Sequence, residues 1–144
     1  MISSEFYFQR VLIIDDSEID VLVNRRLMEL TRFASEIQVT SSGEEGLRYL
    51  KEECGTSSHA PDWIFLDMHL TGMSGYEFIE EFKKLPEYIT HKTKVMVLSV
   101  FNKPEHLKKI FENCFVAGQI EKPLTQQALK DIAHKKANGV ISSM

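Results

Sequence analysis

The stretch Val11-Leu12-Ile13-Ile14-Asp15-Asp16 is a short apolar run that ends in two carboxylates. Three later runs also end in a polar residue, namely Trp63–Leu66 before Asp67, Val95–Leu98 before Ser99, and Gly118–Glu121 before Lys122. Runs that are apolar throughout are typical of parallel strands that helices cover on both faces. Because parallel strands place their carboxyl ends along one edge of the sheet, we expect the polar residues to gather there.

Extended and helical patterns alternate along the chain, which predicts an α/β fold of βα units around a parallel sheet. The expected strands are Arg10–Ile14, Glu36–Thr40, Trp63–Leu66, Lys94–Leu98 and the neighbourhood of Gln119–Ile120. On the first helix the helical period predicts one apolar stripe, made of Ile19, Leu22, Val23, Leu27 and Leu30. A helix before the last strand is expected from Leu107, Ile110 and Phe111, and Thr125 is suited to cap the final helix.

Length and composition indicate one globular domain, residues 1–144, with a core from about residue 10 to about residue 136 and no second domain. The net charge of −4, with both signs interspersed, gives no basic stripe for nucleic acid. No apolar stretch has the length of a signal peptide's core or a membrane span. Cys54 and Cys114 lack a CxxC spacing and are expected to be reduced thiols. We therefore expect a cytoplasmic protein that binds neither membranes nor nucleic acid.

Asp15 and Asp16 have two interpretations when they are taken alone. Acids after a strand are often a solvated strand end or a helix N-cap. Alternatively they hold a hard cation, because Mg²⁺ prefers oxygen ligands and needs only one or two carboxylates beside water and phosphate oxygens. Adjacent like charges also repel each other, and a divalent cation relieves that repulsion.

Each of the other three polar residues at the strand ends also has two interpretations when it is taken alone. Asp67 is either a capping carboxylate or a nucleophile that takes a phosphoryl group, with a metal beside it to offset charge. Ser99 is either a turn serine or a hydrogen-bond donor to phosphoryl oxygens. Lys122 is either a surface charge or a counter-ion that acts on phosphate as a point charge. Their shared order, each after an apolar strand, favours the phosphoryl chemistry.

The chain closely resembles the receiver domain of two-component response regulators. The residues that carry this resemblance are Val-Leu-Ile-Ile-Asp15-Asp16, Pro61-Asp-Trp-Ile-Phe-Leu-Asp67-Met, Gly72-Met-Ser-Gly75, Val95-Met-Val-Leu-Ser99 and Glu121-Lys122-Pro123. The resemblance implies a flavodoxin-like, doubly wound fold, in which five parallel strands in the order 2-1-3-4-5 are covered by five helices. It also implies a phosphoacceptor signalling domain rather than an enzyme, similar to the stand-alone members of the family.

By the same resemblance Asp67 is the phosphoacceptor. Asp16, Asp67 and the backbone carbonyl of His69 would ligate Mg²⁺, and Asp15 would act mainly through a metal-bound water. Ser99 would donate a hydrogen bond to the phosphoryl group, and Lys122 would form an ion pair with it. The implied donor is a histidine kinase or phosphotransfer protein, and the signal would pass to a downstream protein target that the sequence does not name.

Some positions depart from the family pattern and leave rival interpretations open. Thr71 replaces a common proline, so the loop after Asp67 is expected to be more mobile, and Gln119 replaces the aromatic that usually transmits the signal. A phosphate-independent interaction module therefore remains an alternative. An aspartyl-nucleophile phosphatase is disfavoured, because His69 stands where such enzymes need a second acid. Val21 and Met28 lie off the first helix's stripe, which indicates either wider burial or a docking face for the phosphoryl donor.

Overall fold

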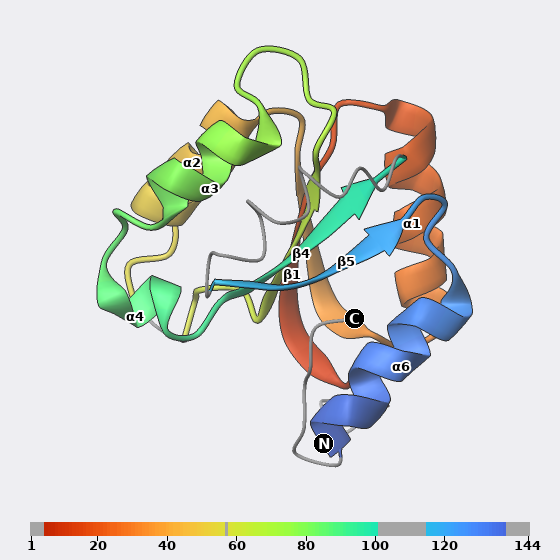
Figure 1. Ribbon diagram of the computed structural model, residues 1–144. Helices are drawn as coiled ribbons and strands as arrows, with labels where there is room; N and C mark the ends of the chain where they lie inside the picture. Colours follow the sequence, from red (N-terminus) through yellow and green to blue (C-terminus); the bar gives the residue numbers. More distant parts are fainter. Residues whose placement is uncertain (1–4, 57, 101–114, 138–144) are drawn as a thin grey trace.

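The computed structural model describes residues 5–56, 58–100 and 115–137 of the chain (Figure 1). In chain order its elements are β1 (Phe8–Ile14), α1 (Glu18–Leu30), β2 (Ala34–Thr40), α2 (Gly43–Glu52), β3 (Trp63–Asp67), α3 (Gly75–Phe82), α4 (Glu87–Thr90), β4 (Lys94–Ser99), β5 (Val116–Glu121) and α6 (Gln126–Ala137). The short helix α4 was not expected from the sequence. The helix expected around Leu107, and Cys114, lie outside the described residues.

The strands form one five-stranded sheet in the order β2-β1-β3-β4-β5, and each neighbouring pair is parallel. This confirms the expected doubly wound architecture and the expected strands, which extend by at most three residues at either end. Because all the strands run the same way, their carboxyl ends share one edge of the sheet (Figure 1).

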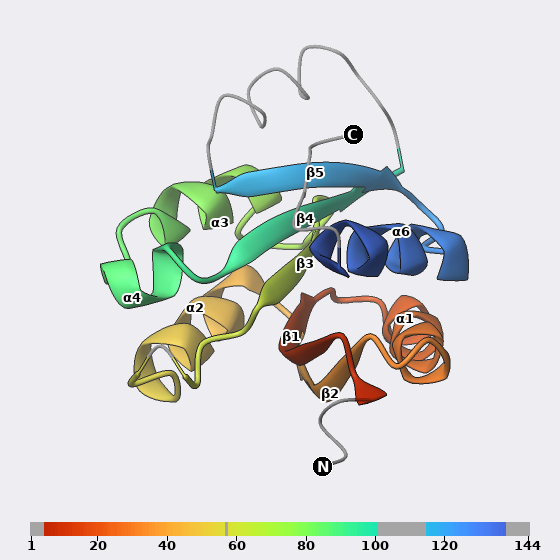
Figure 2. The same ribbon diagram turned by 90° about the horizontal axis from the view of Figure 1, so that it is seen from below.

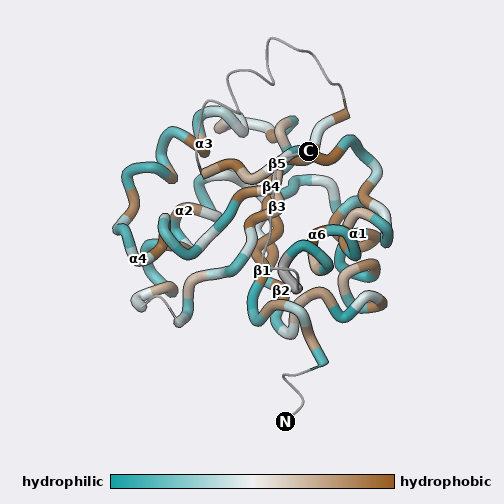
Figure 3. Tube along the Cα trace, turned by 60° about the horizontal axis from the view of Figure 1, so that its bottom comes forward, coloured by the Kyte–Doolittle hydropathy of each residue, from teal (hydrophilic) through white to brown (hydrophobic). Residues whose placement is uncertain are grey.

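Alternate residues of the central strands point to opposite faces of the sheet and build two separate cores. On one face Leu12, Ile64 and Val95 pack with side chains from α2, α3 and α4. On the other face Ile13 and Phe65 pack with side chains from α1 and α6. Figure 2 shows the helices divided in this way between the two faces, and Figure 3 shows the apolar residues concentrated along the central strands. Burial on both sides explains why β3 has no polar residue before Asp67.

Of the apolar stripe predicted on α1, Leu27 packs against the core, but the other four residues are exposed. Ile19 is 74% exposed and Leu22 is 70% exposed, and Val23 and Leu30 are also exposed. The buried residues of this helix are Asn24 and Met28. In the first turn of α1 the Ser17 hydroxyl caps the helix, and Asp20 lies 3.5 Å from Nζ of Lys122 at the sheet edge. Asn24 and Met28 follow Asp20 by about one and two helical turns, so they lie on the same side of the helix and face the sheet. The apolar residues on the other side are therefore exposed to solvent.

The helix starts follow the expected capping chemistry where the sequence predicted it. The Thr125 hydroxyl accepts a hydrogen bond from the backbone N–H of Ala128, which confirms the expected cap of the last helix. Among the described residues no helix is both long enough and apolar enough to cross a membrane.

Candidate functional site

The predicted site residues come together at the carboxyl edge of the sheet. Asp15 follows β1, while Asp67 and Ser99 are the last residues of β3 and β4, and Lys122 follows β5. Asp15, Asp67 and Ser99 are buried there, whereas Asp16 is exposed. Polar groups at this depth need hydrogen bonds, ion pairs or a metal to offset the loss of water.

Asp15, Asp16 and Asp67 each direct one carboxylate oxygen into a common space, and these oxygens lie within 4.8 Å of one another. Oδ1 of Asp15 accepts the backbone N–H of Ser17 at 2.9 Å, but its Oδ2 is buried with no hydrogen-bond partner among the described residues. Burial raises the pKa of Asp15 from its ordinary value of 3.8 to about 6, and the charge of Asp67 adds to this rise. An all-oxygen donor set with an unsatisfied buried carboxylate oxygen fits a hard divalent cation such as Mg²⁺.

Asp67 is buried and forms an ion pair with Lys122, which is only partly buried. Its Oδ1 lies 2.9 Å from Nζ of Lys122 and also accepts the backbone N–H of His69 at 3.0 Å. Asp20 of α1 approaches the same ammonium at 3.5 Å. Burial acts to lower the pKa of Lys122, but the hydrogen bond to Asp67 and the charges of Asp67, Asp15 and Asp20 outweigh it, so this pKa lies above its ordinary value. The ammonium is therefore a fixed positive charge beside the carboxylates.

The backbone fixes the position of Lys122 as well. Its N–H donates to the carbonyl of Ser99 at 2.8 Å, which joins the end of β4 to the segment after β5. The Lys122–Pro123 peptide bond is cis. The roles expected for the Ser99 hydroxyl and for the His69 carbonyl stay predictions.

Asp16 is anchored by a residue that the sequence did not predict to contact it. Its Oδ2 accepts two hydrogen bonds from Thr71, one from the backbone N–H at 3.0 Å and one from the side-chain hydroxyl at 2.8 Å. These two bonds lower the pKa of Asp16. The contact of Asp20 with Lys122 was not predicted either. Neither contact has a signal in the sequence, because each joins segments that only the fold brings together.

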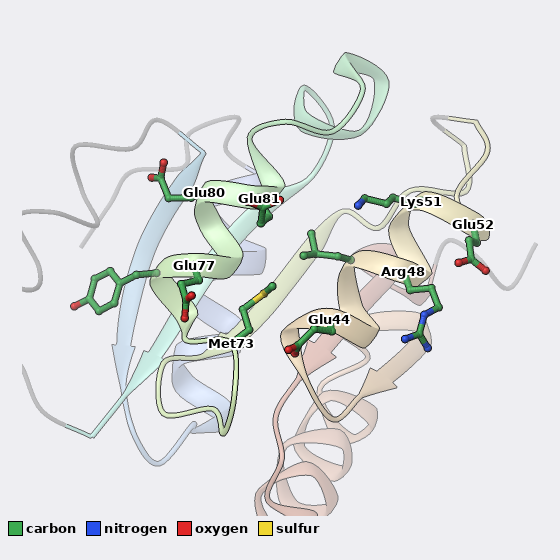
Figure 4. Close-up of a pocket in the computed structure, with 10 residues that line it drawn as sticks. Glu44, Arg48, Lys51, Glu52, Met73, Glu77, Glu80 and Glu81 are labelled. Carbon is green, nitrogen blue, oxygen red and sulfur yellow. The ribbon is translucent and has the colours of Figure 1, made fainter.

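A separate groove runs between α2 and α3, with a volume of about 650 Å³. Figure 4 shows Met73 in this groove, with Glu44 and Glu77 beside it at one end and Lys51 and Glu81 at the other. None of the predicted site residues lines it. Met73, which lines the groove, belongs to the loop between β3 and α3.

Comparison with known proteins agrees with this geometry. The family model described as the response regulator receiver domain matches residues 11–134. The chain belongs to this family. The receiver is also similar to the crystal structure of a two-component response regulator from Cytophaga hutchinsonii, with 30% identity and a TM-score of 0.82 over 91% of this chain and 98% of the other.

Two further matches are more distant. A response regulator receiver protein from Dyadobacter fermentans has the same fold, with 21% identity and a TM-score of 0.77 over 89% of this receiver and 96% of the other chain. Histidine kinase CKI1 of Arabidopsis thaliana is 31% identical over 98 residues, which are 63% of this receiver but only 9% of that protein. The receiver thus spans a small part of the length of this relative.

Proposed function

We propose that this receiver accepts a phosphoryl group on Asp67 in a Mg²⁺-dependent reaction and signals through a change in a protein-binding surface. The observation that carries the proposal is the ion pair between the buried Asp67 and Lys122, beside the carboxylates of Asp15 and Asp16. A buried carboxylate that is oriented by an ammonium and a backbone N–H is suited to act as a nucleophile. Membership of the receiver family supports a signalling role rather than turnover of a substrate.

In the proposed reaction a carboxylate oxygen of Asp67 attacks the phosphorus of the donor. A new phosphorus–oxygen bond forms while the bond from phosphorus to the donor breaks, and the donor leaves with the electron pair of that bond. The ammonium of Lys122 lies 2.9 Å from Asp67 and stabilises negative charge on the transferred group. The Ser99 hydroxyl, at the end of the neighbouring strand, would donate a hydrogen bond to a phosphoryl oxygen.

Asp15, Asp16 and Asp67 would hold the Mg²⁺ ion, with the backbone carbonyl of His69 as a further ligand. When bound, Mg²⁺ neutralises charge on the phosphoryl oxygens and on the crowded carboxylates. The orphan Oδ2 of Asp15 would gain a partner, either the ion or a water bound to it. The protein's own contribution is to hold the carboxylates together before the ion arrives.

We propose a histidine kinase or histidine phosphotransfer protein as the donor, docked on the outer face of α1. The residues Ile19, Leu22, Val23 and Leu30 form an apolar surface on this helix, with Ile19 one turn from the site. Exposed apolar patches of this kind commonly mark protein–protein contacts. The position next to Asp20, which approaches Lys122, would bring the donor histidine close to Asp67.

Intact-mass analysis after treatment with acetyl phosphate and Mg²⁺ tests the proposal. We expect one phosphoryl group on the wild type, none on Asp67→Asn, and none on the wild type when EDTA replaces Mg²⁺. Asp131→Asn is the matched control, because Asp131 is an exposed carboxylate on α6, and this variant should be labelled like the wild type. Equal labelling of Asp67→Asn would show that the acceptor is another residue. No labelling of the wild type would favour the phosphate-independent interaction module.

A further inference from the structure

Thr71 joins the loop after β3 to the loop after β1. Its backbone N–H and its hydroxyl donate to the same oxygen, Oδ2 of Asp16, at 3.0 and 2.8 Å. Asp16 and Thr71 are both exposed and lie 55 residues apart in the sequence. An exposed aspartate without such a partner is free to change rotamer, whereas two hydrogen bonds to one oxygen restrict it to one orientation.

The two hydrogen bonds are compatible with the convergence of the three carboxylates. With both bonds formed, one oxygen from each of Asp15, Asp16 and Asp67 already lies within 4.8 Å of the others. A contact that turned Asp16 away from its neighbours would instead have to break before a cation could bind. The Thr71 contact therefore favours the cation-binding arrangement.

Thr71 is itself held in place by the structure on its C-terminal side. Gly72 has a φ of +81°, a left-handed conformation that lets the chain turn immediately after Thr71. Two residues later a capping box between Ser74 and Glu77 fixes the start of α3. The loop that carries Thr71 is thus fixed at its C-terminal end by the start of α3.

We propose that Thr71 is a positioning residue for the metal: its hydroxyl holds the Asp16 carboxylate in the orientation that binds Mg²⁺. This inference rests on the Mg²⁺ dependence proposed above. Of the two donors, the hydroxyl is the one that depends on the side chain, because every residue except proline supplies a backbone N–H. Its removal should weaken Mg²⁺ binding without changing the fold or the nucleophile.

Calorimetric titration of the protein with Mg²⁺ alone, with no phosphoryl donor present, tests this inference. Thr71→Val keeps the shape and the backbone N–H but loses the hydroxyl, and we expect its affinity for Mg²⁺ to fall about five-fold, the size of one lost hydrogen bond to a carboxylate at an exposed site. Thr71→Ser restores the hydroxyl and should bind Mg²⁺ nearly as tightly as the wild type. Thr31→Val, which removes a hydroxyl at the far end of α1, is the matched control and should not differ from the wild type.

A second measurement separates positioning from a general loss of activity. The rate of labelling by acetyl phosphate at saturating Mg²⁺ should be the same for Thr71→Val and the wild type, while the variant should need about five-fold more Mg²⁺ for half of that rate. Equal Mg²⁺ affinities of wild type and Thr71→Val would overturn the inference and leave the proposed function intact. Failure of Thr71→Ser to restore affinity would also overturn it. A wild type that binds no Mg²⁺ would overturn both proposals.

Discussion

Replacement of Asp15 by asparagine should stabilise the metal-free protein while it damages the site. Asp15 is only 2% exposed, and its Oδ2 has no hydrogen-bond partner among the described residues. Burial raises its pKa to about 6, against an ordinary value of 3.8. A carboxyl that is harder to ionise in the folded state than in the unfolded state makes folding less favourable wherever it is ionised.

The size of this effect follows from the difference between the two pKa values. One pH unit corresponds to about 1.4 kcal/mol, so the difference between 3.8 and about 6 costs the folded state about 3 kcal/mol at pH 7.5. Asparagine has similar shape and can still accept the N–H of Ser17, but carries no charge. We therefore expect Asp15→Asn to raise the free energy of unfolding by up to about 3 kcal/mol at pH 7.5. The gain should fall as the pH drops below 6, to about half near pH 5, and nearly vanish below 4.

Urea unfolding in EDTA, followed at pH 7.5, 5 and 4 for both proteins, measures these free energies. Saturating Mg²⁺ should reduce this difference at pH 7.5, because binding of the ion adds RT ln(1 + [Mg²⁺]/Kd) to the free energy of unfolding and the variant, which has lost a carboxylate, binds the ion more weakly. The reasoning would be refuted if Asp15→Asn were less stable than the wild type in EDTA at pH 7.5. A gain of the same size at pH 4 would also refute it, since it could not come from ionisation.

The other predictions concern the donor surface, the packing of a helix and the ion pair. Leu22→Glu should change the free energy of unfolding by less than about 0.5 kcal/mol, because the side chain is 70% exposed. Acetyl phosphate should label this variant at the rate of the wild type, but a phosphotransfer protein that labels the wild type should label the variant more slowly. If that protein labelled both at the same rate, docking on α1 would be wrong. Gly46→Ala should lower the free energy of unfolding by about 1–3 kcal/mol, since a Cβ would lie 2.6 Å from Cδ1 of Ile14. Gly55→Ala has open space around the new Cβ and should leave the free energy of unfolding nearly unchanged, and chemical denaturation measures both. Lys122→Met should lower the free energy of unfolding in EDTA by about 1–3 kcal/mol, because it leaves the buried carboxylate of Asp67 without its counter-ion. In the same denaturation assay Mg²⁺ should recover part of this loss. A loss that Mg²⁺ does not reduce would contradict the idea that the ion and the ammonium neutralise the same carboxylates.

The centre of the sheet could be predicted closely from the sequence because β1, β3 and β4 are largely buried on both faces. A strand such as Trp63–Leu66 has no polar residue, and an acid directly after it marks where the sheet meets solvent. The same logic located Asp15 and Ser99, and Lys122 lies at the same edge because β5 runs parallel to the other strands. These residues are determined by local pattern and by the shared direction of parallel strands, so one sequence is enough to place them.

The orientation of α1 shows where this logic fails. The helical period correctly identifies a helix, but its outer face is as apolar as its inner face, with Leu22 exposed and Met28 buried. Periodicity cannot choose between two apolar faces. The choice appears only in the folded protein, where Asp20 approaches Lys122 and Asn24 and Met28 on the same side of the helix are buried.

The sequence by itself thus determined the parallel α/β architecture and the places of Asp67, Ser99 and Lys122 at its edge, because each ends or directly follows a strand that runs parallel to the others. Only the tertiary structure decided which face of α1 is exposed to solvent, and that Thr71 donates two hydrogen bonds to Asp16 across 55 residues of chain. The physical reason is that these features depend on contacts between segments far apart in the sequence. Local propensity does not predict such contacts, and nothing in the sequence around Thr71 indicates that its hydroxyl binds the carboxylate of Asp16.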